Sequence, residues 1–380
     1  MIITQTPFRL TLGGGGTDLP SYYSQYGGFI LSMAIDKYMY ISLNTPLLSA
    51  CIQVRYSQNE VCRGPSEVRH TLARAALEFL GVAQQIEIVS IADIPSGTGL
   101  GSSGCYLIGL LNGLHTLLGC PVGPEQLAEE ACHIELDLLR KPVGKQDQYM
   151  AAFGGLTTLN IDASGRVQVD ALRVHPETLE SLEANTLLFY TGVSRDALDI
   201  LGQQSREVRR DNAVVVESLH QIKAIGLEIQ SALMRGDVHR FGELLDVHWQ
   251  SKKRLSNGIS NPQIDAWYEL ARKNGAVGGK ISGAGGGGFL MVYCDNGKAR
   301  LREAMSAAGL VELRFRLNYE GSKVLVNCMP TDKCWQHVMR LKEVIVRVPE
   351  KVDLPVAPPE VAAAPMGLPA AGADRPHVRP

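Results

Sequence analysis

Hydrophobic and polar positions alternate along the first half of the chain in a pattern typical of strands, with helical periodicity between them. Strands are predicted over 1–12, 29–43, 53–56, 85–92 and 154–161. Helices are predicted over 67–80, 105–119 and 124–139. The second of these helices is apolar on all sides, which is typical of a buried helix.

The pattern changes near residue 190, after which the helices become longer and more charged. Amphipathic helices are predicted over 196–232, 237–255 and 262–274. A strand over 288–294, a helix over 297–308 and strands over 310–317 and 323–327 are predicted to close the second half. We therefore expect an α+β protein in two lobes, formed by residues 1–190 and 191–330.

The remaining segment, 331–380, is predicted to be a C-terminal extension outside both lobes. From about Val348 it is rich in proline and alanine, without periodicity or aromatic residues. Such a composition buries too little apolar surface to offset the entropy of ordering, so we expect disorder from about residue 348.

Composition narrows the function classes. The 380-residue chain has 45% hydrophobic and 20% charged residues, as expected of a globular protein. Its net charge of −2 supplies no field that would attract nucleic acid or an anionic membrane, so we expect neither as a partner. The N-terminus has no basic region followed by an apolar core, which favours a cytoplasmic protein. The oligomeric state is left open.

The segment "IPSGTGLGSSGC", residues 94–105, contains G-x-G-x-x-G at Gly99, Gly101 and Gly104. A dinucleotide-binding turn needs a second parallel strand after the following helix, with an acidic residue about 20 positions on. That position holds the helical sequence "PVGPEQLAEEACHIELD", which argues against a dinucleotide. A Walker loop is excluded as well, because no lysine follows the glycines.

The same loop nevertheless predicts a phosphate site. Glycines let backbone N–H groups approach an anion closely, and the N-terminus of the following helix adds partial positive charge. Ser102 and Ser103 add two hydroxyls. We expect one of them to cap the helix and the other to bind Mg²⁺.

Two further glycine clusters, "LGGGGTDLP" and "KISGAGGGGF", each abut a predicted strand. Three such clusters suggest the walls of one site that approach a ligand closely. Asp147 lies in "GKQDQYMAAFGG", a polar segment predicted to connect a helix to a strand.

Together these segments resemble the GHMP kinase superfamily, which includes galactokinases and mevalonate kinases. P-x-R followed by an apolar strand and T-D matches Pro7 through Asp18. P-x-x-x-G-L-G-S-S matches Pro95 through Ser103, and K-I-S-G-A-G-G-G-G matches Lys280 through Gly288. The resemblance implies a two-lobed fold, with a ribosomal protein S5 domain 2-like N-terminal lobe and a ferredoxin-like C-terminal lobe.

The resemblance also implies ATP as phosphate donor, Mg²⁺ as cofactor and a division of roles among the residues. Asp147 is the expected catalytic base and Arg9 the cation beside the transferring phosphate. Mg²⁺ is expected on Ser103 and Glu135, with Glu129 and Glu130 as alternatives to the glutamate. The triphosphate is expected to contact Pro95, Gly97, Gly99, Leu100, Gly101, Ser102, Ser103 and Gly104.

One departure from the family concerns the sugar. Galactokinases carry an acidic residue and a histidine where this chain has Gly15 and Gly16, so we expect a roomier pocket. The sequence most resembles the branch that phosphorylates the anomeric hydroxyl of D-glycero-D-manno-heptose 7-phosphate for nucleotide-activated heptose, with fucokinase-type enzymes as relatives. The expected substrate-binding residues are Gly15, Gly16, Thr17, Asp18, Lys145, Gln146, Tyr190, Arg195, Gly283 and Gly285.

A phosphate already present on the sugar requires cations at its far end. Lys145 and Arg195 are the first candidates, with Arg140 and Lys141 behind them. Two alternatives to a heptose kinase remain: a kinase for another sugar such as fucose, and a non-catalytic protein that only binds nucleotide or sugar. The presence of Asp147 and both serines favours an enzyme.

Overall fold

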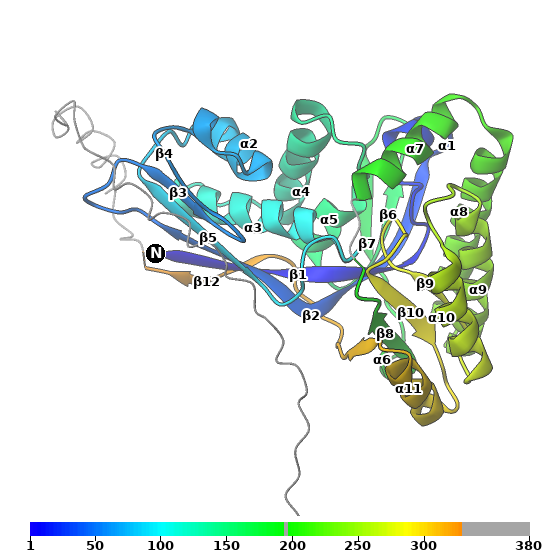
Figure 1. Ribbon diagram of the computed structural model, residues 1–380. Coiled ribbons are helices and arrows are strands. Elements are labelled where there is room, and N and C mark those ends of the chain that lie inside the picture. The colour runs from blue at the N-terminus through cyan, green and yellow to red at the C-terminus, as the bar shows by residue number, and fades with distance from the viewer. Residues whose placement is uncertain (194–196, 329–380) are drawn as a thin grey trace, which may run out of the picture. The chain divides into compact units, whose positions relative to one another are not determined.

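The computed structural model describes residues 1–193 and 197–328, and all of them belong to one unit, Met1–Thr331. These residues form two β-sheets with helices packed against them (Figure 1). The expected extension from 331, including the segment from about 348, lies outside the described residues.

The larger sheet has eight strands and contains the N-terminus. Its order is β12-β1-β2-β5-β3-β4, with β6 paired to β2 and β7 to β6. The strands are β1 (Ile2–Gly13), β2 (Gly28–Asn44), β3 (Ile52–Arg55), β4 (Asn59–Cys62), β5 (Ile86–Ala92), β6 (Leu156–Ile161), β7 (Val167–Ala171) and β12 (Lys323–Asn327). The long strand β2 pairs with β6 through its first half and with β5 through its second.

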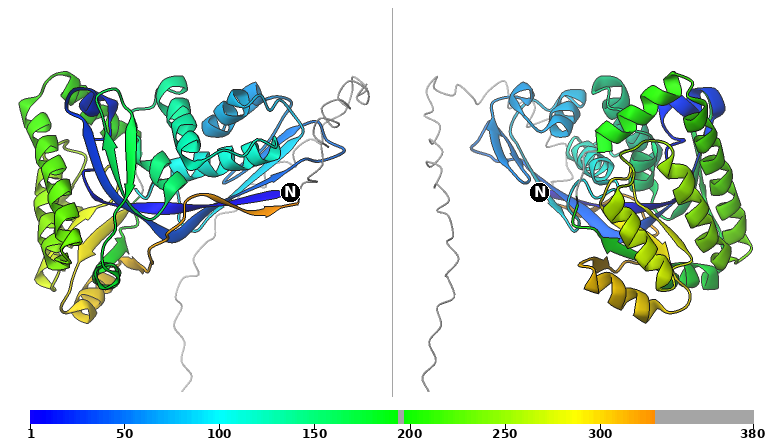
Figure 2. Two further views of the ribbon diagram at one scale, coloured as in Figure 1. Left: turned by 180° about the vertical axis from the view of Figure 1, so that it is seen from behind. Right: turned by 45° about the vertical axis from the view of Figure 1, so that its right-hand side comes forward.

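Helices cover one face of this sheet, as Figures 1 and 2 show from opposite sides. They are α2 (Thr71–Phe79), α3 (Ser102–Leu117), α4 (Pro124–Cys132), which continues into the π-helical turn η2 (His133–Leu138), and α5 (Gln146–Phe153). Helix α3 is buried along most of its length because its apolar residues face both the sheet and the neighbouring helices. The short segments α1 (Pro20–Tyr26) and η1 (Pro65–Glu67) complete this half.

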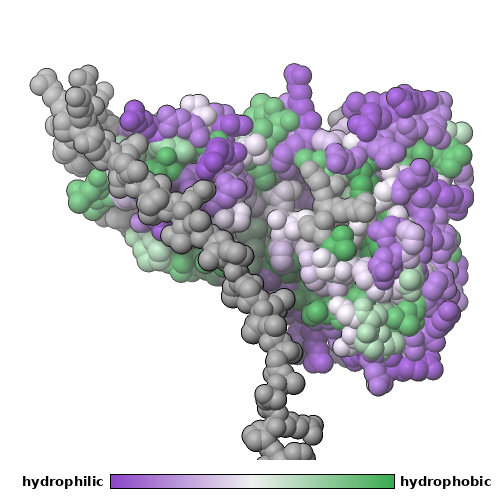
Figure 3. Space-filling view, in the orientation of Figure 1, coloured by the Kyte–Doolittle hydropathy of each residue, from purple (hydrophilic) through white to green (hydrophobic). Residues whose placement is uncertain are grey.

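The second sheet has four strands in the order β11-β8-β10-β9. They are β8 (Thr186–Tyr190), β9 (Gly278–Ile281), β10 (Phe289–Tyr293) and β11 (Val311–Leu313). Its helices are α6 (Pro176–Asn185), α7 (Ala197–Arg209), α8 (Ala213–Met234), α9 (Val238–Lys253), α10 (Pro262–Lys273) and α11 (Lys298–Ala307). Leu219, Trp249 and Leu290 belong to the apolar core that joins these helices to the sheet. Hydrophilic residues dominate the outer side of the helices at the right of Figure 3.

Most predicted elements are present, and the exceptions have local causes. The helix expected over 196–232 is two helices, because Asp211 adopts a positive φ of 55° and Asn212 caps α8. The segment around Asp147 is helix α5 rather than a connection. Among the described residues, no helix is long and apolar enough to cross a membrane.

The strand at 323–327 does not close the second half as expected. It is β12, which pairs antiparallel with β1 at the edge of the first sheet. If the chain is divided into two lobes near residue 190, strand β12 belongs to the sheet of the first lobe although it follows the second in sequence.

Candidate active site

A pocket of about 750 Å³ collects all three glycine clusters. Its lining includes residues of the loop after β1, of the loop before α3 with the first turn of that helix, and of the loop between β9 and β10. They are Gly15 and Gly16; Gly97, Gly99, Gly101, Ser102 and Ser103; and Ser282, Gly283, Ala284, Gly285 and Gly287. Gly99 has φ of +82°, and a Cβ there would lie 2.5 Å from the Ser282 carbonyl oxygen. The second and third loops thus touch at a position that only glycine permits.

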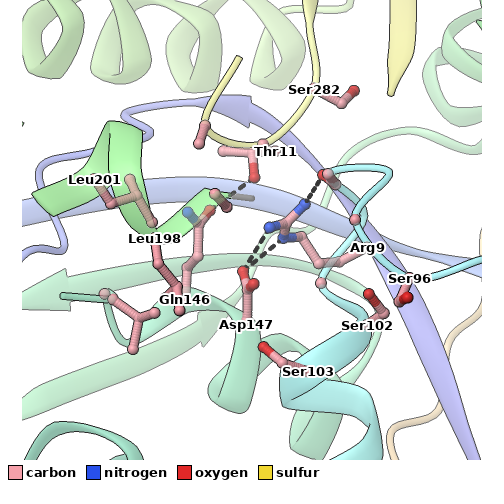
Figure 4. A pocket seen from close by; sticks show the side chains of 18 of the residues that line it. Arg9, Thr11, Ser96, Ser102, Ser103, Gln146, Asp147, Leu198, Leu201 and Ser282 are labelled. Atoms are coloured by element: carbon pink, nitrogen blue, oxygen red, sulfur yellow. Dashed lines mark hydrogen bonds and ion pairs between the residues drawn. The ribbon is translucent and has the colours of Figure 1, made fainter. Parts of the chain in front are cut away.

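The N-terminus of α3 faces this pocket without a side-chain cap. Gly101 is the N-cap residue, in a left-handed conformation, and within residues 1–193 and 197–328 the helix has no side-chain cap hydrogen bond. The expectation that one of the two serines caps the helix is therefore wrong. Ser102 and Ser103 instead line the pocket in the first turn (Figure 4). Uncapped N–H groups and the helix dipole together suit an anion.

Arg9 and Asp147 meet beside this helix end, as Figure 4 shows. Both Nε and Nη2 of Arg9 donate to Asp147 Oδ1, at 2.9 and 2.6 Å, while Nη1 donates to the Gly99 carbonyl at 2.7 Å. A Cβ at Gly104 would lie 2.8 Å from Asp147 Cβ, so α3 and α5 approach closely here. The arginine therefore links the carboxylate to the glycine loop.

The residues of the phosphate loop differ in their exposure to the pocket. Pro95, Gly97, Gly99, Gly101, Ser102 and Ser103 line it, whereas Leu100 and Gly104 are buried and do not. The Leu100 carbonyl accepts from the Arg9 N–H at 3.1 Å, which ties the loop to β1. These two residues hold the loop in place.

Asp18 is almost completely buried and lines the pocket. Its carboxylate accepts from the Gly16 and Gln146 backbone N–H groups at 3.2 and 3.1 Å. Burial raises its pKa to about 6, and the nearby Asp147 charge adds to that rise. Gln146 also lines the pocket, whereas the Thr17 hydroxyl donates to the carbonyls of Gly14 and Phe29 and is structural.

Among the three glutamates considered for Mg²⁺, only Glu135 lines the pocket. It is buried, and its two oxygens accept from Lys141 Nζ at 3.1 Å and Gln148 Nε2 at 2.6 Å. Burial raises its pKa despite these donors. Glu130 is bound to His115, and Glu129 interacts with Lys145 and Tyr149.

Of the cations that were expected to bind a phosphate on the sugar, some line the pocket and others do not. Lys145 does not line the pocket, because its ammonium donates to the Gly165 carbonyl at 2.6 Å and lies 3.4 Å from Glu129. This placement argues against direct contact with a ligand there. Arg195 lies outside the described residues. Tyr190 packs against Phe289 and does not line the pocket, whereas Lys141, Gly283 and Gly285 do.

Two groups of lining residues were given no role by the sequence analysis. His248 and Lys252 on α9 and Lys280 on β9 are buried and line the pocket. Tyr56, His70 and Tyr106 also line it and form an aromatic cluster, with the His70 ring centroid 4.8 Å from that of Tyr56 and 4.4 Å from that of Tyr106. Two signals in the sequence pointed to the first group: the i, i+4 spacing of His248 and Lys252 on α9, and the place of Lys280 at the start of the K-I-S-G-A-G-G-G-G motif.

A pocket built on an uncapped helix N-terminus, with an adjacent carboxylate and arginine, is the arrangement of a phosphotransferase. Comparison with known proteins agrees. Residues 68–155 match the family model for the GHMP kinases N terminal domain, and residues 229–310 match the model for the GHMP kinases C terminal region. The chain belongs to the GHMP kinases, which use ATP as phosphate donor, and is a sugar kinase of that family.

Individual relatives support this assignment. A D-glycero-alpha-D-manno-heptose 7-phosphate kinase from Campylobacter jejuni is 32% identical, over 77% of this chain and 89% of that protein. An L-fucokinase/L-fucose-1-P guanylyltransferase from Bacteroides fragilis is 26% identical, over 78% of this chain but 35% of that protein. A crystal structure of a D-glycero-D-manno-heptose 1-phosphate kinase from Bacteroides thetaiotaomicron covers 87% of this chain and 100% of its own, with a TM-score of 0.72 and 24% identity. The expected GHMP kinase fold is confirmed.

Proposed function

We propose that this kinase phosphorylates the anomeric hydroxyl of D-glycero-D-manno-heptose 7-phosphate, giving the 1,7-bisphosphate. The observation that carries the proposal is the pocket wall at Gly15 and Gly16, which carry no side chains and line the same pocket as Arg9 and Asp147. A Cβ at Gly15 would have Thr11 Cγ2, at 3.4 Å, as its nearest neighbour, whereas one at Gly16 would lie 2.8 Å from Gln204 Nε2, so the free space is at Gly15. A seven-carbon sugar needs that room. The heptose 7-phosphate kinase from Campylobacter jejuni, which this chain resembles at 32% identity, supports the same acceptor.

Asp147 is the proposed base in this reaction. As the sugar O1 forms its bond to the terminal phosphorus of ATP, the bond from that phosphorus to the bridging oxygen breaks and ADP leaves. The hydroxyl proton passes to the Asp147 carboxylate. Arg9 holds this carboxylate in place and sets positive charge beside the transferring group, while the N-terminus of α3 binds phosphate oxygens.

Ser103 and Glu135 fit a magnesium site. Both line the pocket, and a hydroxyl and a carboxylate supply the oxygen ligands that Mg²⁺ prefers alongside phosphate oxygens. When bound, the ion would neutralise charge on the phosphates. The described residues contain no group of three or more His, Cys, Asp or Glu side chains suited to a metal, so a metal here depends on ligands from the nucleotide.

The aromatic cluster is the proposed site for the nucleotide base. Tyr56, His70 and Tyr106 line the pocket together with the apolar Leu72 and Ile94. Aromatic faces stack on a base with an energy of about 1–3 kcal/mol. Burial lowers the pKa of His70, so its ring is neutral at pH 7 and suited to stacking.

A second candidate acceptor is free fucose, favoured by the match to the fucokinase from Bacteroides fragilis. A screen of ATP consumption over phosphorylated and free sugars distinguishes the two. We expect kcat/KM to be highest for the heptose 7-phosphate, above fucose, galactose and mevalonate. Equal turnover of free fucose would overturn the heptose assignment and leave the kinase assignment standing.

A further inference from the structure

Three buried basic side chains lie together at the pocket without acidic partners. They are His248 and Lys252, one turn apart on α9, and Lys280 on the adjoining strand β9. Their exposed fractions are 1, 7 and 2%, and all three line the pocket. We refer to His248, Lys252 and Lys280 as the buried basic cluster.

The hydrogen bonds of this cluster leave its charge uncompensated. Lys252 Nζ donates to the carbonyls of Ile281 and Gly283, and Lys280 Nζ donates to the Leu12 carbonyl at 3.3 Å. Within residues 1–193 and 197–328, neither ammonium has a carboxylate within 4.0 Å. Both ring nitrogens of His248 and the hydroxyl of neighbouring Ser282 are buried without any partner in this part of the chain.

Such an arrangement is costly for the ligand-free protein. Burial lowers the pKa of Lys252 to about 7, with the Arg9 charge adding to the effect, and lowers the pKa of Lys280 well below its usual value. Proteins rarely bury an unpaired charge, because its lost hydration is not repaid. A structural lysine would have been paired, so the cluster is suited to an anion that arrives from outside.

The position of the cluster indicates which anion fits. The Arg9 charge acts on both lysines, and the same guanidinium binds the Asp147 carboxylate. Lys252 also holds the Gly283 carbonyl, in the loop that touches Gly99. An anion at the cluster would therefore lie inside the pocket, near Arg9 and the loop that touches Gly99.

Deepening the proposed function, on which it rests, we propose that His248, Lys252 and Lys280 form a buried binding site for a phosphate dianion. Two ammonium groups match its charge, and the unpartnered His248 ring and Ser282 hydroxyl supply further hydrogen bonds. The phosphate comes from one of two sources, the phosphate carried by the acceptor sugar or the terminal phosphate of the nucleotide. No acidic side chain competes for this position among the described residues.

The test measures equilibrium binding without turnover, by calorimetry, with four probes. Heptose 7-phosphate is compared with free heptose, and the non-hydrolysable ATP analogue AMPPNP is compared with ADP. The proteins are the full chain and its Lys252→Met and Lys280→Met variants. Lys253→Met is the matched control, because Lys253 is the next residue on α9 but pairs with Asp265 and does not line the pocket.

If the sugar phosphate is the source, each cluster variant should weaken binding of heptose 7-phosphate by about tenfold to a hundredfold and leave free heptose nearly unchanged. If the nucleotide is the source, the same loss should appear for AMPPNP and not for ADP. Lys253→Met should match the unsubstituted chain with every probe. Both patterns support the site, and they tell the two sources apart.

The proposal is overturned if both variants keep the unsubstituted protein's preference for heptose 7-phosphate and for AMPPNP. It is also overturned if all four probes weaken equally while the ligand-free melting temperature falls, since that is a structural role. We expect instead that Lys280→Met melts at the same or a higher temperature without ligand, because an unpaired buried charge is removed. Failure of the heptose assignment shows separately, as absence of the sugar-phosphate preference in the unsubstituted chain.

Discussion

The basic residues near the two ends of helix α9 differ in their exposure and in their hydrogen-bond partners. Near its start, Arg240 donates to Glu228 at 2.7 Å and to Glu243 at 2.7 Å, on a surface where all three side chains are partly exposed. Near its end, Lys252 is buried and donates only to carbonyl oxygens. The same helix therefore carries one exposed cation that is paired with carboxylates and one buried cation that has carbonyl oxygens but, among the described residues, no carboxylate as partner.

This difference distinguishes exposed charges, which form ion pairs on the surface, from buried charges, which are suited to binding a ligand. An exposed ion pair contributes little to stability, because water already solvates both groups. An unpartnered buried charge is destabilising, and it persists where a ligand supplies the missing partner. By this criterion the pocket groups Asp18, Lys252 and Lys280 belong to binding, while Arg240 belongs to the surface.

The largest effect is expected at Asp147, the pocket carboxylate that is paired with Arg9. Asp147→Asn should lower kcat by roughly 10²- to 10⁴-fold, because the amide cannot accept the hydroxyl proton. Binding of AMPPNP should persist, since Asp147 acts on the acceptor. Single-turnover kinetics together with calorimetry check both halves, and near-normal turnover would remove Asp147 from the mechanism.

The second-largest effect is expected at Asp18, a buried carboxyl group that has no cationic partner among the described residues. Its folded-state pKa of about 6 exceeds the ordinary 3.8, so protonation stabilises the folded protein. This contribution is fully present below about pH 4 and is lost as the pH rises through 6. Asp18→Asn removes this loss. The stability that the variant gains over the unsubstituted protein should therefore be larger at pH 8 than at pH 4, by up to about 3 kcal/mol in the free energy of unfolding.

Urea unfolding of both proteins at pH 4 and pH 8 measures this gain, while sugar turnover should fall. A variant that is equally destabilised at both pH values would show that Asp18 stabilises the fold.

Glu135 tests whether a pocket carboxylate that already has donors also binds a metal. Glu135→Gln should raise the Mg²⁺ concentration needed for half-maximal activity by roughly tenfold or more. Glu130→Gln is the matched control, because Glu130 is bound to His115 and does not line the pocket. A larger shift in the control than in Glu135→Gln would transfer the proposed ligand to the other glutamate.

The smallest effect is expected at the partnered surface cation. Arg240→Ala should leave both the midpoint of urea unfolding and kcat/KM nearly unchanged, because water already solvates the exposed charges. Urea unfolding at low and high salt measures the effect on stability. A large loss of stability would contradict the distinction drawn between the two ends of α9.

The sequence predicted the parts of the site that depend on local motifs. Patterns that span a few residues predict the glycine loop before α3 and the order of strands and helices. Arg9 on β1 was singled out by the family resemblance. The meeting of Gly99 with Ser282 and Gly283 was foreseen only in outline, as three glycine clusters forming one site. Each of these features needs a particular backbone conformation, which leaves a mark in the sequence.

The parts that depend on long-range packing were not predictable. Lys252 lies in "HWQSKKRL", which reads as the end of an ordinary charged helix, and β9 supplies the packing that buries it. Lys145, two residues before the proposed base, turns to Gly165 instead of the pocket. Strand β12 pairs with β1, although the two strands lie near opposite ends of the described sequence. Side-chain direction and strand pairing at such separations are set by tertiary contacts, which local periodicity does not encode.

The central claim is that the acceptor already carries a phosphate at its far end and receives the new one at O1. Phosphorus NMR of reactions with ATP and either heptose 7-phosphate or heptose 1-phosphate tests it most directly. The account predicts that the 7-phosphate is consumed, with a new phosphate resonance coupled to the anomeric proton, and that the 1-phosphate is left unchanged. Consumption of the 1-phosphate in place of the 7-phosphate would contradict it.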